Sequence, residues 1–280
     1  MMKTYNVNQI KDRVKEICME LAYKINDDLK GALESGEKSE SSQLGKEVLC
    51  MLLENAEIAE NQAIPICQDT GMVIVYLEIG QGITLEGGFI GDAVNQGVRE
   101  AYEEGYLRKS IVDPITRLNT KDNTPANIHY ELVPGDKIKL SILLKGFGSE
   151  NMGKVKMLTP SEGVPGIIEF VLDTIKTAGG NPCPPLVIGI GIGGTMDKAA
   201  TMAKKALFRP IGERSQDDFL KELEENLLKQ INELNIGPMG FGGKTTALEV
   251  FAEKYPTHLA GLPVAVNINC HALRRKTIEL

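Results

Sequence analysis

Three of the five cysteines lie at predicted ends of secondary-structure elements, where a thiolate can meet a metal. Cys67 opens the segment CQDTG, in which a thiol, an amide, a carboxylate and a hydroxyl crowd one turn. Cys183 stands between prolines in NPCPP, and Cys270 ends an apolar strand just before His271. No two cysteines have the close C-x₂-C spacing that is typical of zinc sites. A [4Fe–4S] cluster on three thiolates would leave one iron open as a Lewis acid.

Spacing alone also allows five unrelated reduced thiols. Cys18 and Cys50 lie inside helical patterns, and we expect both to fill the core. The prolines beside Cys183 predict a rigid, extended backbone there. An odd number of widely spaced cysteines, without an export signal, argues against a secreted disulfide framework. A purely structural partner whose thiols bind nothing therefore remains one interpretation.

A glycine run offers a different chemistry, the binding of a dinucleotide. Gly189, Gly191 and Gly194 match the G-x-G-x-x-G fingerprint between a predicted strand and a predicted helix. The second strand that this site needs does not follow, because Pro210 and a helical stretch at 215–235 come next. We interpret the run as an anion-receiving or packing turn, and keep a dinucleotide-binding enzyme as a distant alternative.

A second glycine-rich run, GFGGKT at residues 240–245, resembles the end of a P-loop. Pro238 stands where that motif needs its first glycine, and the preceding segment is predicted as helix. A P-loop needs a strand leading into it, so the sequence argues against a nucleotide cradle here.

The elements that position these residues are helical first and mixed afterwards. Apolar residues recur at helical spacing over residues 6–62. After Gly71 a β-branched run predicts a strand, and a helix is predicted from about Ile90 to Tyr106. Residues 108–127 are rich in Pro, Asn, Thr and Asp and predict a long ordered loop.

The second half of the chain alternates strands and helices. The runs IHYELV and KIKLSILLK around Pro134–Asp136 predict a hairpin. A strand is predicted at 186–190, and helices near 165–177, 197–207 and 215–235. A short helix and a final apolar strand, LPVAVNINC, are predicted last. We therefore predict a mixed α+β fold, with a helical N-terminal region of about 1–63, in one compact domain spanning 1–280.

Composition limits the classes of partner. The formal net charge of −7 argues against a nucleic-acid surface, and 5% aromatic residues without Trp offer few stacking platforms. No apolar run approaches the roughly 18 residues of a membrane span, and the N-terminus alternates charged and apolar residues. We expect a cytoplasmic protein that acts on small molecules or binds proteins, with no nucleic acid and no membrane.

Four segments, in this order, resemble the alpha part of class I (iron–sulfur) fumarases and of L-tartrate dehydratase: ICQDTG, KGFGSEN, NPCPPLVIGIGIGGTMDKAA and NCHALRR. The resemblance covers most of the chain from about residue 40. It implies a [4Fe–4S] cluster bound by Cys67, Cys183 and Cys270. It also implies a set of substrate contacts, with Asp69 as the candidate for proton transfer: Gln68, Asp69, Arg108, Gly146 and Gly148.

The resemblance further implies a partner chain. Single-chain members continue into a second domain, whereas this sequence ends at Leu280. We therefore expect the alpha subunit of the two-subunit form, inactive without a separate beta subunit and assembled as a hetero-oligomer such as α2β2. The expected substrate is a C4 dicarboxylate, and the expected reaction is reversible hydration of fumarate to L-malate. Dehydration of L-tartrate to oxaloacetate is the close alternative, because one extra hydroxyl need not change these motifs.

Overall fold

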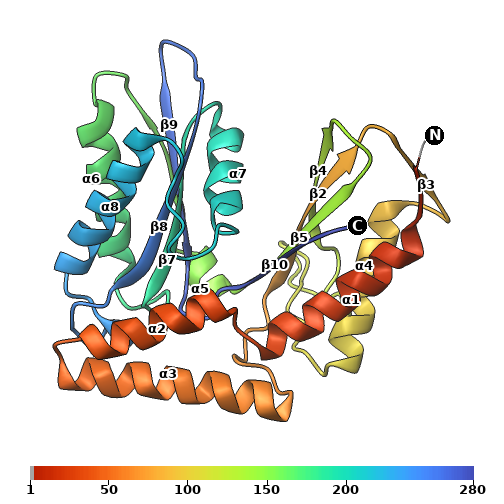
Figure 1. Ribbon diagram of the computed structural model, residues 1–280, viewed down its shortest axis with the longest axis horizontal. Helices are drawn as coiled ribbons and strands as arrows, with labels where there is room; N and C mark the ends of the chain where they lie inside the picture. The colour runs from red at the N-terminus through yellow and green to blue at the C-terminus, as the bar shows by residue number, and fades with distance from the viewer. Residues whose placement is uncertain (1–2) are drawn as a thin grey trace. The chain divides into compact units, whose positions relative to one another are not determined.

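The computed structural model describes residues 3–280, which form two compact units (Figure 1). Unit 1 contains the described residues up to Ile25, together with Ala56–Phe147 and Arg274–Leu280. Unit 2 contains Asn26–Asn55 and Gly148–Leu273. Each unit has its own sheet and its own apolar core. The mixed α+β class is confirmed, and the single domain over 1–280 stays a prediction.

The helical opening is confirmed as three helices: α1 Val7–Tyr23, α2 Asp27–Ser39 and α3 Gln43–Gln62. The side chain of Asn6 accepts a hydrogen bond from the Asn8 N–H and so caps the start of α1. The apolar stripe that predicted α1 is its buried face, and it includes Ile10, Val14 and Ile17.

Unit 1 is built on a four-stranded sheet in the order β10–β5–β2–β4. Its strands are β2 Met72–Gly80, β4 Asn127–Val133, β5 Ile138–Lys145 and β10 Arg274–Glu279. Helix α4, Ile90–Glu104, packs beside α1, and both helices share one apolar core with β2 and β5. A short parallel pair completes the unit: β1 Lys3–Asn6 and β3 Ile83–Glu86.

The hairpin predicted around Pro134–Asp136 is wrong in its pairing. β4 and β5 do not pair, because β2 lies between them, parallel to β4 and antiparallel to β5. The connection crosses the end of β2, where Gly80 N–H donates to Lys137 O and Gly82 N–H donates to Gly135 O. Turn residues signal that the chain reverses, but they do not say which strand fills the space between the two arms.

Unit 2 is built on a second four-stranded sheet, in the order β6–β9–β7–β8. Its strands are β6 Lys154–Leu158, β7 Leu186–Gly193, β8 Ala247–Tyr255 and β9 Leu262–Asn269. Two helices, α6 Gly163–Ala178 and α8 Asp218–Glu233, cover one face of this sheet, and α7 Met196–Ala206 covers the other (Figure 1). Two short turns of helix complete the elements: α5 Phe147–Glu150 and the 3₁₀ turn Pro238–Gly240.

The short helix predicted before the last apolar strand is instead β8. The segment ALEVFAEKY contains good helix formers, but it pairs in parallel with β7, and Val250, Phe251 and Ala252 are fully buried. Glu249 is buried too, and its carboxylate pairs with Arg214. Tertiary pairing therefore overrides intrinsic propensity here. The predicted strand LPVAVNIN is confirmed as β9, and β10, which the sequence did not predict, follows it.

The glycine run at 189–194 lies mostly inside β7, which continues to Gly193, and not in a turn. A Cβ atom at Gly189 would lie 1.9 Å from Ala203 O, and one at Gly191 would lie 2.0 Å from Ala199 O. Both carbonyls belong to α7, so the glycines let the helix backbone approach the strand closely. Packing of α7 on β7 therefore accounts for the spacing that resembles a dinucleotide fingerprint.

The substitution Gly189→Ala should destabilise the protein by about 3 kcal/mol or more, because the added methyl overlaps the Ala203 carbonyl and α7 must move. The matched control is Gly261→Ala, where an added Cβ meets no atom within 4 Å, and a change within about 0.5 kcal/mol is expected. Chemical denaturation of both variants measures the difference. Equal stabilities would contradict the close packing of α7 on β7.

Candidate functional site

The segment CQDTG forms a tight turn between α3 and β2 in unit 1. Cys67 and Gln68 are exposed, whereas Thr70 is only 1% exposed. Gly71 has φ +86°, and a Cβ there would lie 3.0 Å from the backbone of β5 at Leu144 and Lys145. A glycine is therefore required for this turn to lie against β5.

Hydrogen bonds from α4 and from the segment after it hold this turn. The Tyr102 hydroxyl lies 2.9 Å from both Thr70 O and Gly71 O. Asn123 Nδ2 donates to Gly71 O at 3.2 Å, and Thr70 Oγ1 donates to Arg108 O at 2.8 Å. Burial raises the pKa of Tyr102, so its hydroxyl keeps the proton that it donates. Sequence reasoning missed Tyr102 and Asn123, because only the fold brings them to the turn.

The carboxylate of Asp69 is held by two backbone donors. Its Oδ1 accepts from Gly71 N–H at 3.0 Å, and its Oδ2 accepts from Phe147 N–H at 2.8 Å. The second bond joins the CQDTG turn to the KGF segment and places Asp69 beside Gly146. Asp69 is half-buried, so the structure gives it a fixed orientation and partial access to solvent. These are the properties that proton transfer to a bound substrate requires.

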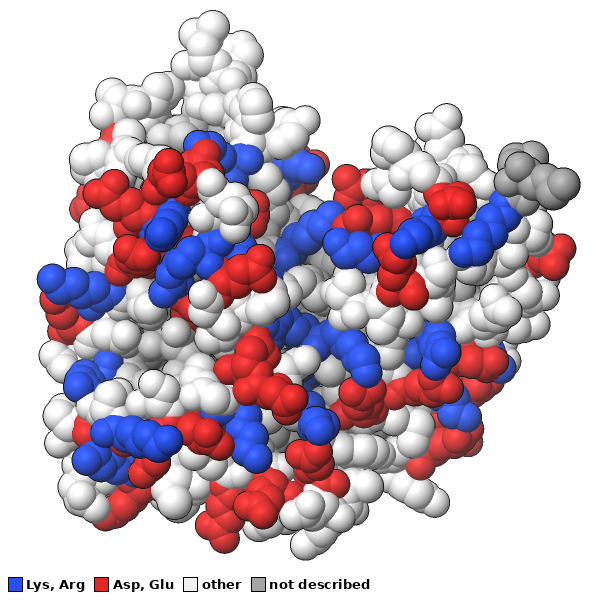
Figure 2. Space-filling model, in the orientation of Figure 1, with Lys and Arg blue, Asp and Glu red and all other residues white. Residues whose placement is uncertain are grey.

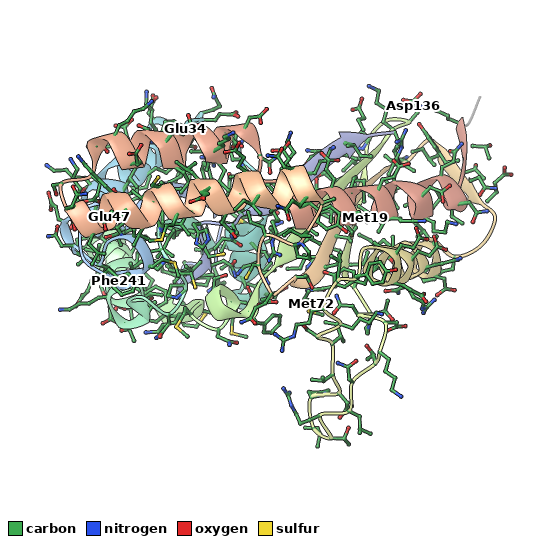
Figure 3. All side chains as sticks on the ribbon, turned by 90° about the horizontal axis from the view of Figure 1, so that it is seen from below. Met19, Glu34, Glu47, Met72, Asp136 and Phe241 are labelled. Carbon is green, nitrogen blue, oxygen red and sulfur yellow. The ribbon has the colours of Figure 1, made fainter. Side chains whose placement is uncertain are left out.

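Arg108 follows α4, and its side chain is exposed while its carbonyl is tied to Thr70. The segment from Arg108 to Ala126 has no helix and is ordered by local hydrogen bonds, such as Ser110 N–H to Asn123 Oδ1 at 2.8 Å. In Figure 3 it extends away from the helices of unit 1, beyond the labelled Met72. The predicted long ordered loop is confirmed.

In unit 2 the segments that carry Cys183 and Cys270 come together. His271, the residue after Cys270, donates its N–H to Cys183 O at 3.3 Å, and its Nδ1 lies 3.1 Å from the same oxygen. Both cysteines are half-buried, and neither forms a disulfide. His271 thus has a structural role, which is to join two predicted ligand segments.

The backbone at Cys183 is not extended, as the flanking prolines predicted, but left-handed, with φ +55°. Its N–H donates to Gly180 O at 3.1 Å, so a turn closes just before Pro184 and sets the conformation. Gly148, also in unit 2, is exposed, and a Cβ there would lie 3.8 Å from Asn181 O. Gly148 and the NPCPP segment are therefore neighbours in this unit.

The two remaining cysteines differ from each other. Cys18 is fully buried, and burial raises the pKa of its thiol to about 12, so the thiol stays protonated. Its assignment to the core is confirmed. Cys50 is exposed on α3, so its assignment to the core was wrong, because Val48 and Leu49 are the buried residues of that turn.

The ligand assignment divides between the two units, with Cys67 in unit 1 and Cys183 and Cys270 in unit 2. Across residues 3–280, no group of three or more His, Cys, Asp or Glu side chains is arranged so that it could hold a metal ion. The chemistry of the donors nevertheless suits iron, because all three thiols lie at turns or strand ends and none is sealed in a core as Cys18 is. Their joint role therefore stays a prediction.

The loop GFGGKT, which resembles a P-loop end, already holds a carboxylate of its own chain. Glu40 is 2% exposed; its Oε1 accepts from Ser42 N–H at 2.9 Å and Lys244 N–H at 3.1 Å, and its Oε2 accepts from Thr245 N–H at 2.8 Å. Burial alone would raise the pKa of Glu40, but these amide donors and the side chain of Thr245 lower it to about 2. Glu40 thus occupies the place that a phosphate takes in a nucleotide cradle.

Other surface features lie apart from the predicted site residues. A cavity of about 560 Å³ in unit 2, lined by α2, α8 and the residues around Thr245, includes none of them. Lys and Arg side chains are interspersed with Asp and Glu over the visible face of each unit (Figure 2). Within residues 3–280, no helix is both long enough and apolar enough to cross a membrane.

Comparison with known proteins identifies similar chains. A family model described as fumarate hydratase (Fumerase) matches residues 11–279. The putative L(+)-tartrate dehydratase subunit alpha of Methanocaldococcus jannaschii is 48% identical over 280 residues, which cover 97% of this chain and 98% of the relative. The L(+)-tartrate dehydratase subunit alpha of Escherichia coli K12 is 31% identical over 280 residues, which cover 99% and 92% of the two chains.

The substitution Glu40→Gln should destabilise unit 2 by roughly 2–4 kcal/mol at pH 7, because an NH₂ group would replace an oxygen that faces amide donors. The pKa of Glu40 is lower in the folded chain than its ordinary value of 4.5. Its contribution is therefore complete above about pH 4.5 and is lost as the pH falls toward 2. The unfolding free energies of the wild type and of Glu40→Gln should therefore approach each other as the pH falls from 7 to 3, and denaturation at several pH values in this range measures the difference.

The control for this prediction is Glu34→Gln on α2, labelled in Figure 3. Glu34 is partly exposed, so its substitution should change stability by about 0.5 kcal/mol or less. A Glu40→Gln variant as stable as this control at pH 7 would show that the carboxylate does not hold the loop.

Proposed function

From the premise that this chain belongs to the fumarate hydratase (Fumerase) family, we propose that it is the cluster-binding alpha subunit of a [4Fe–4S] hydro-lyase. Family membership and the names of the relatives make it a hydro-lyase chain of the alpha type. The proposed reaction is reversible hydration of fumarate to L-malate, carried out together with a separate beta subunit. The proposal places the enzyme in the cytoplasm.

One observation carries the proposal: the carboxylate of Asp69 is fixed by two amides two residues after an exposed cysteine. A hydro-lyase must add or remove a proton at one carbon of its substrate, so it needs a base in a fixed orientation. The hydrogen bonds of Asp69 provide that orientation before any substrate binds. In the proposal, Asp69 transfers this proton together with a group of the beta subunit.

The proposed cluster ligands are Cys67, Cys183 and Cys270. A cluster with three thiolate ligands supplies, when bound, an open iron that polarises the hydroxyl and one carboxylate of the substrate. The His271 contacts to Cys183 O support a joint role for Cys183 and Cys270. The exposure of Cys67 supports its availability as the third ligand.

The substrate contacts in the proposal all come from the segments described above. Arg108 binds one carboxylate with its exposed guanidinium, which suits the two oxygens of a carboxylate. Gln68 is exposed beside Asp69 and can hydrogen-bond the substrate. The backbone at Gly146 and Gly148 contributes further hydrogen bonds.

The name "subunit alpha", shared by the relatives, implies a beta partner. We propose that this partner completes the acid–base pair and that the assembly is a hetero-oligomer such as α2β2. A subunit that carries only half of the catalytic groups should have little activity, because hydration needs an acid and a base on defined faces of the substrate. The alpha chain alone is therefore expected to be nearly inactive.

Dehydration of L-tartrate to oxaloacetate is supported equally well. The relatives are named tartrate dehydratases, whereas the family model is named for fumarate hydratase. Both substrates are C4 dicarboxylates, so Arg108 and Asp69 suit either. The identity of the substrate therefore needs a direct assay.

Anaerobic reconstitution of the chain with iron and sulfide should give a brown protein that binds about four irons, because three thiolates can hold a [4Fe–4S] cluster. Alanine substitution of Cys67, Cys183 or Cys270 should each abolish this binding. Visible absorption detects the cluster, and iron analysis gives the number of irons bound per chain.

The matched control is Cys50→Ala, because Cys50 is exposed but lies on a helix and belongs to no predicted ligand set. It should bind as much iron as the wild type. A colourless wild-type protein, or a cluster that survives all three ligand substitutions, would refute the cluster assignment.

The reconstituted complex of alpha and beta subunits should hydrate fumarate with a higher kcat/KM than it dehydrates L-tartrate. Spectrophotometric assays of both acids, with the alpha chain alone as control, make the comparison. A preference for tartrate would establish the alternative. Failure on both acids by a complex that carries its cluster would refute the hydro-lyase assignment to C4 acids.

A further inference from the structure

In the described part of the chain, a buried arginine near Asp69 has two guanidinium nitrogens without a hydrogen-bond partner. Arg274, the first residue of β10, is 1% exposed. Its Nε and Nη1 atoms are buried, and neither finds a hydrogen-bond partner within residues 3–280. A guanidinium stays charged at every accessible pH, and a buried charge without partners is costly. Such a residue calls for an anion that arrives from outside the chain.

The third nitrogen of Arg274 and the carboxylate of Asp69 lie beside the same glycine, Gly146. A Cβ atom built on Gly146 would lie 3.5 Å from Arg274 Nη2 and 3.3 Å from Asp69 Oδ2. Gly146 therefore lies against both charged groups, and a side chain at this position would crowd them. Both oxygens of Asp69 already accept backbone hydrogen bonds. In the described part of the chain, Asp69 and Arg274 form no ion pair.

Two further cations are buried on the same two strands. Lys145 ends β5 and is fully buried, and Arg275 follows Arg274 on β10 and is 4% exposed. Arg274 pairs with Leu144 in the antiparallel register of β10 and β5, so all three cations lie at one end of this strand pair. Lys145 Nζ lies 3.5 Å from Gly146 O, at the same glycine. Arg274 and Arg275 are successive strand residues and point to opposite faces of the sheet, so Arg274 is the cation that lies on the same side of Gly146 as Asp69.

We propose that Arg274 is a second carboxylate-binding residue of the substrate site, distinct from Arg108. It binds one carboxylate of the C4 diacid through its guanidinium, beside Gly146. A diacid has two carboxylates, and Arg108 alone serves one. Binding at Arg274 also brings the substrate next to the proton-transfer group, since Asp69 lies beside the same glycine. The inference rests on the proposed function, because it takes a C4 dicarboxylate as the substrate.

The test uses the reconstituted complex of both subunits and measures KM and kcat separately. Arg274→Met should raise KM by about 10- to 100-fold, because a charge-assisted hydrogen bond is lost. The kcat should stay within about threefold, since Asp69 keeps both of its backbone donors. Arg274→Lys should show a smaller rise in KM, because it keeps the charge and loses the planar fork.

A binding measurement without turnover completes the test. Succinate, an unreactive C4 diacid, should raise the thermal unfolding midpoint of the wild-type complex and should have a much smaller effect on Arg274→Met. The control variant is Arg13→Gln, because Arg13 is exposed on α1 and pairs only with a surface glutamate. This control should keep the wild-type KM and the wild-type response to succinate.

The outcomes separate the inference from the proposed function. If the wild type neither hydrates fumarate nor dehydrates L-tartrate, the proposed function fails. If the wild type is active and the Arg274→Lys variant keeps the wild-type KM, the inference is overturned even if the Met variant does not fold. The inference is also overturned if kcat falls in both variants while KM and the response to succinate stay at wild-type values.

Discussion

The close contact of Gly71 with the backbone of β5 is the constraint on which the rest of unit 1 depends. Its left-handed φ lets the CQDTG turn approach β5 so closely that a Cβ atom on Gly71 would lie 3.0 Å from the backbone of Leu144 and Lys145. The same contact brings the start of β2 into register beside the end of β5. From there Asp69 reaches the Phe147 amide, so the orientation of the proposed base follows from a backbone contact.

Unit 2 uses a comparable device for a different purpose. Gly189 and Gly191 bring α7 onto β7, and β7 in turn lies between β8 and β9 in the sheet. Because β9 leads directly into Cys270, the position of that thiol depends on how this sheet packs. His271 then joins the strand end to the Cys183 turn. Glycines that resemble a nucleotide motif thus serve the packing of the sheet whose strand β9 leads into Cys270.

The sequence predicted what depends on local pattern. The apolar period of α1 and the turn at Gly71 follow from residue types alone, and both are confirmed. The prediction for β8 failed, because burial of Val250 and Phe251 against neighbouring elements outweighs the helix propensity of ALEVFAEKY. The hairpin failed for a related reason, since the strand that separates β4 from β5 comes much earlier in the chain.

In the candidate site, too, residues that are adjacent in sequence were predicted and residues that only the fold brings together were not. CQDTG was recognisable as a site because its chemistry lies in consecutive residues. Tyr102, Asn123 and Arg274 were not, because each lies far from CQDTG in sequence and approaches its residues only after folding. For Arg274 there was a local signal, the pair of arginines in NCHALRR, but a basic pair usually marks an exposed surface. Burial distinguishes it, and burial is a property of the fold.

The groups on this chain also bear on the choice between fumarate and tartrate under the proposed function. Arg108 and the buried Arg274 both suit carboxylates, and the two acids share these. Discrimination therefore has to come from a group that responds to the additional hydroxyl of tartrate. A neutral hydrogen-bonding side chain does this best, since a polar group left unpaired in a closed site costs binding energy. On this chain, Gln68 is the exposed amide beside Asp69, so specificity would depend on Gln68 and on the beta subunit.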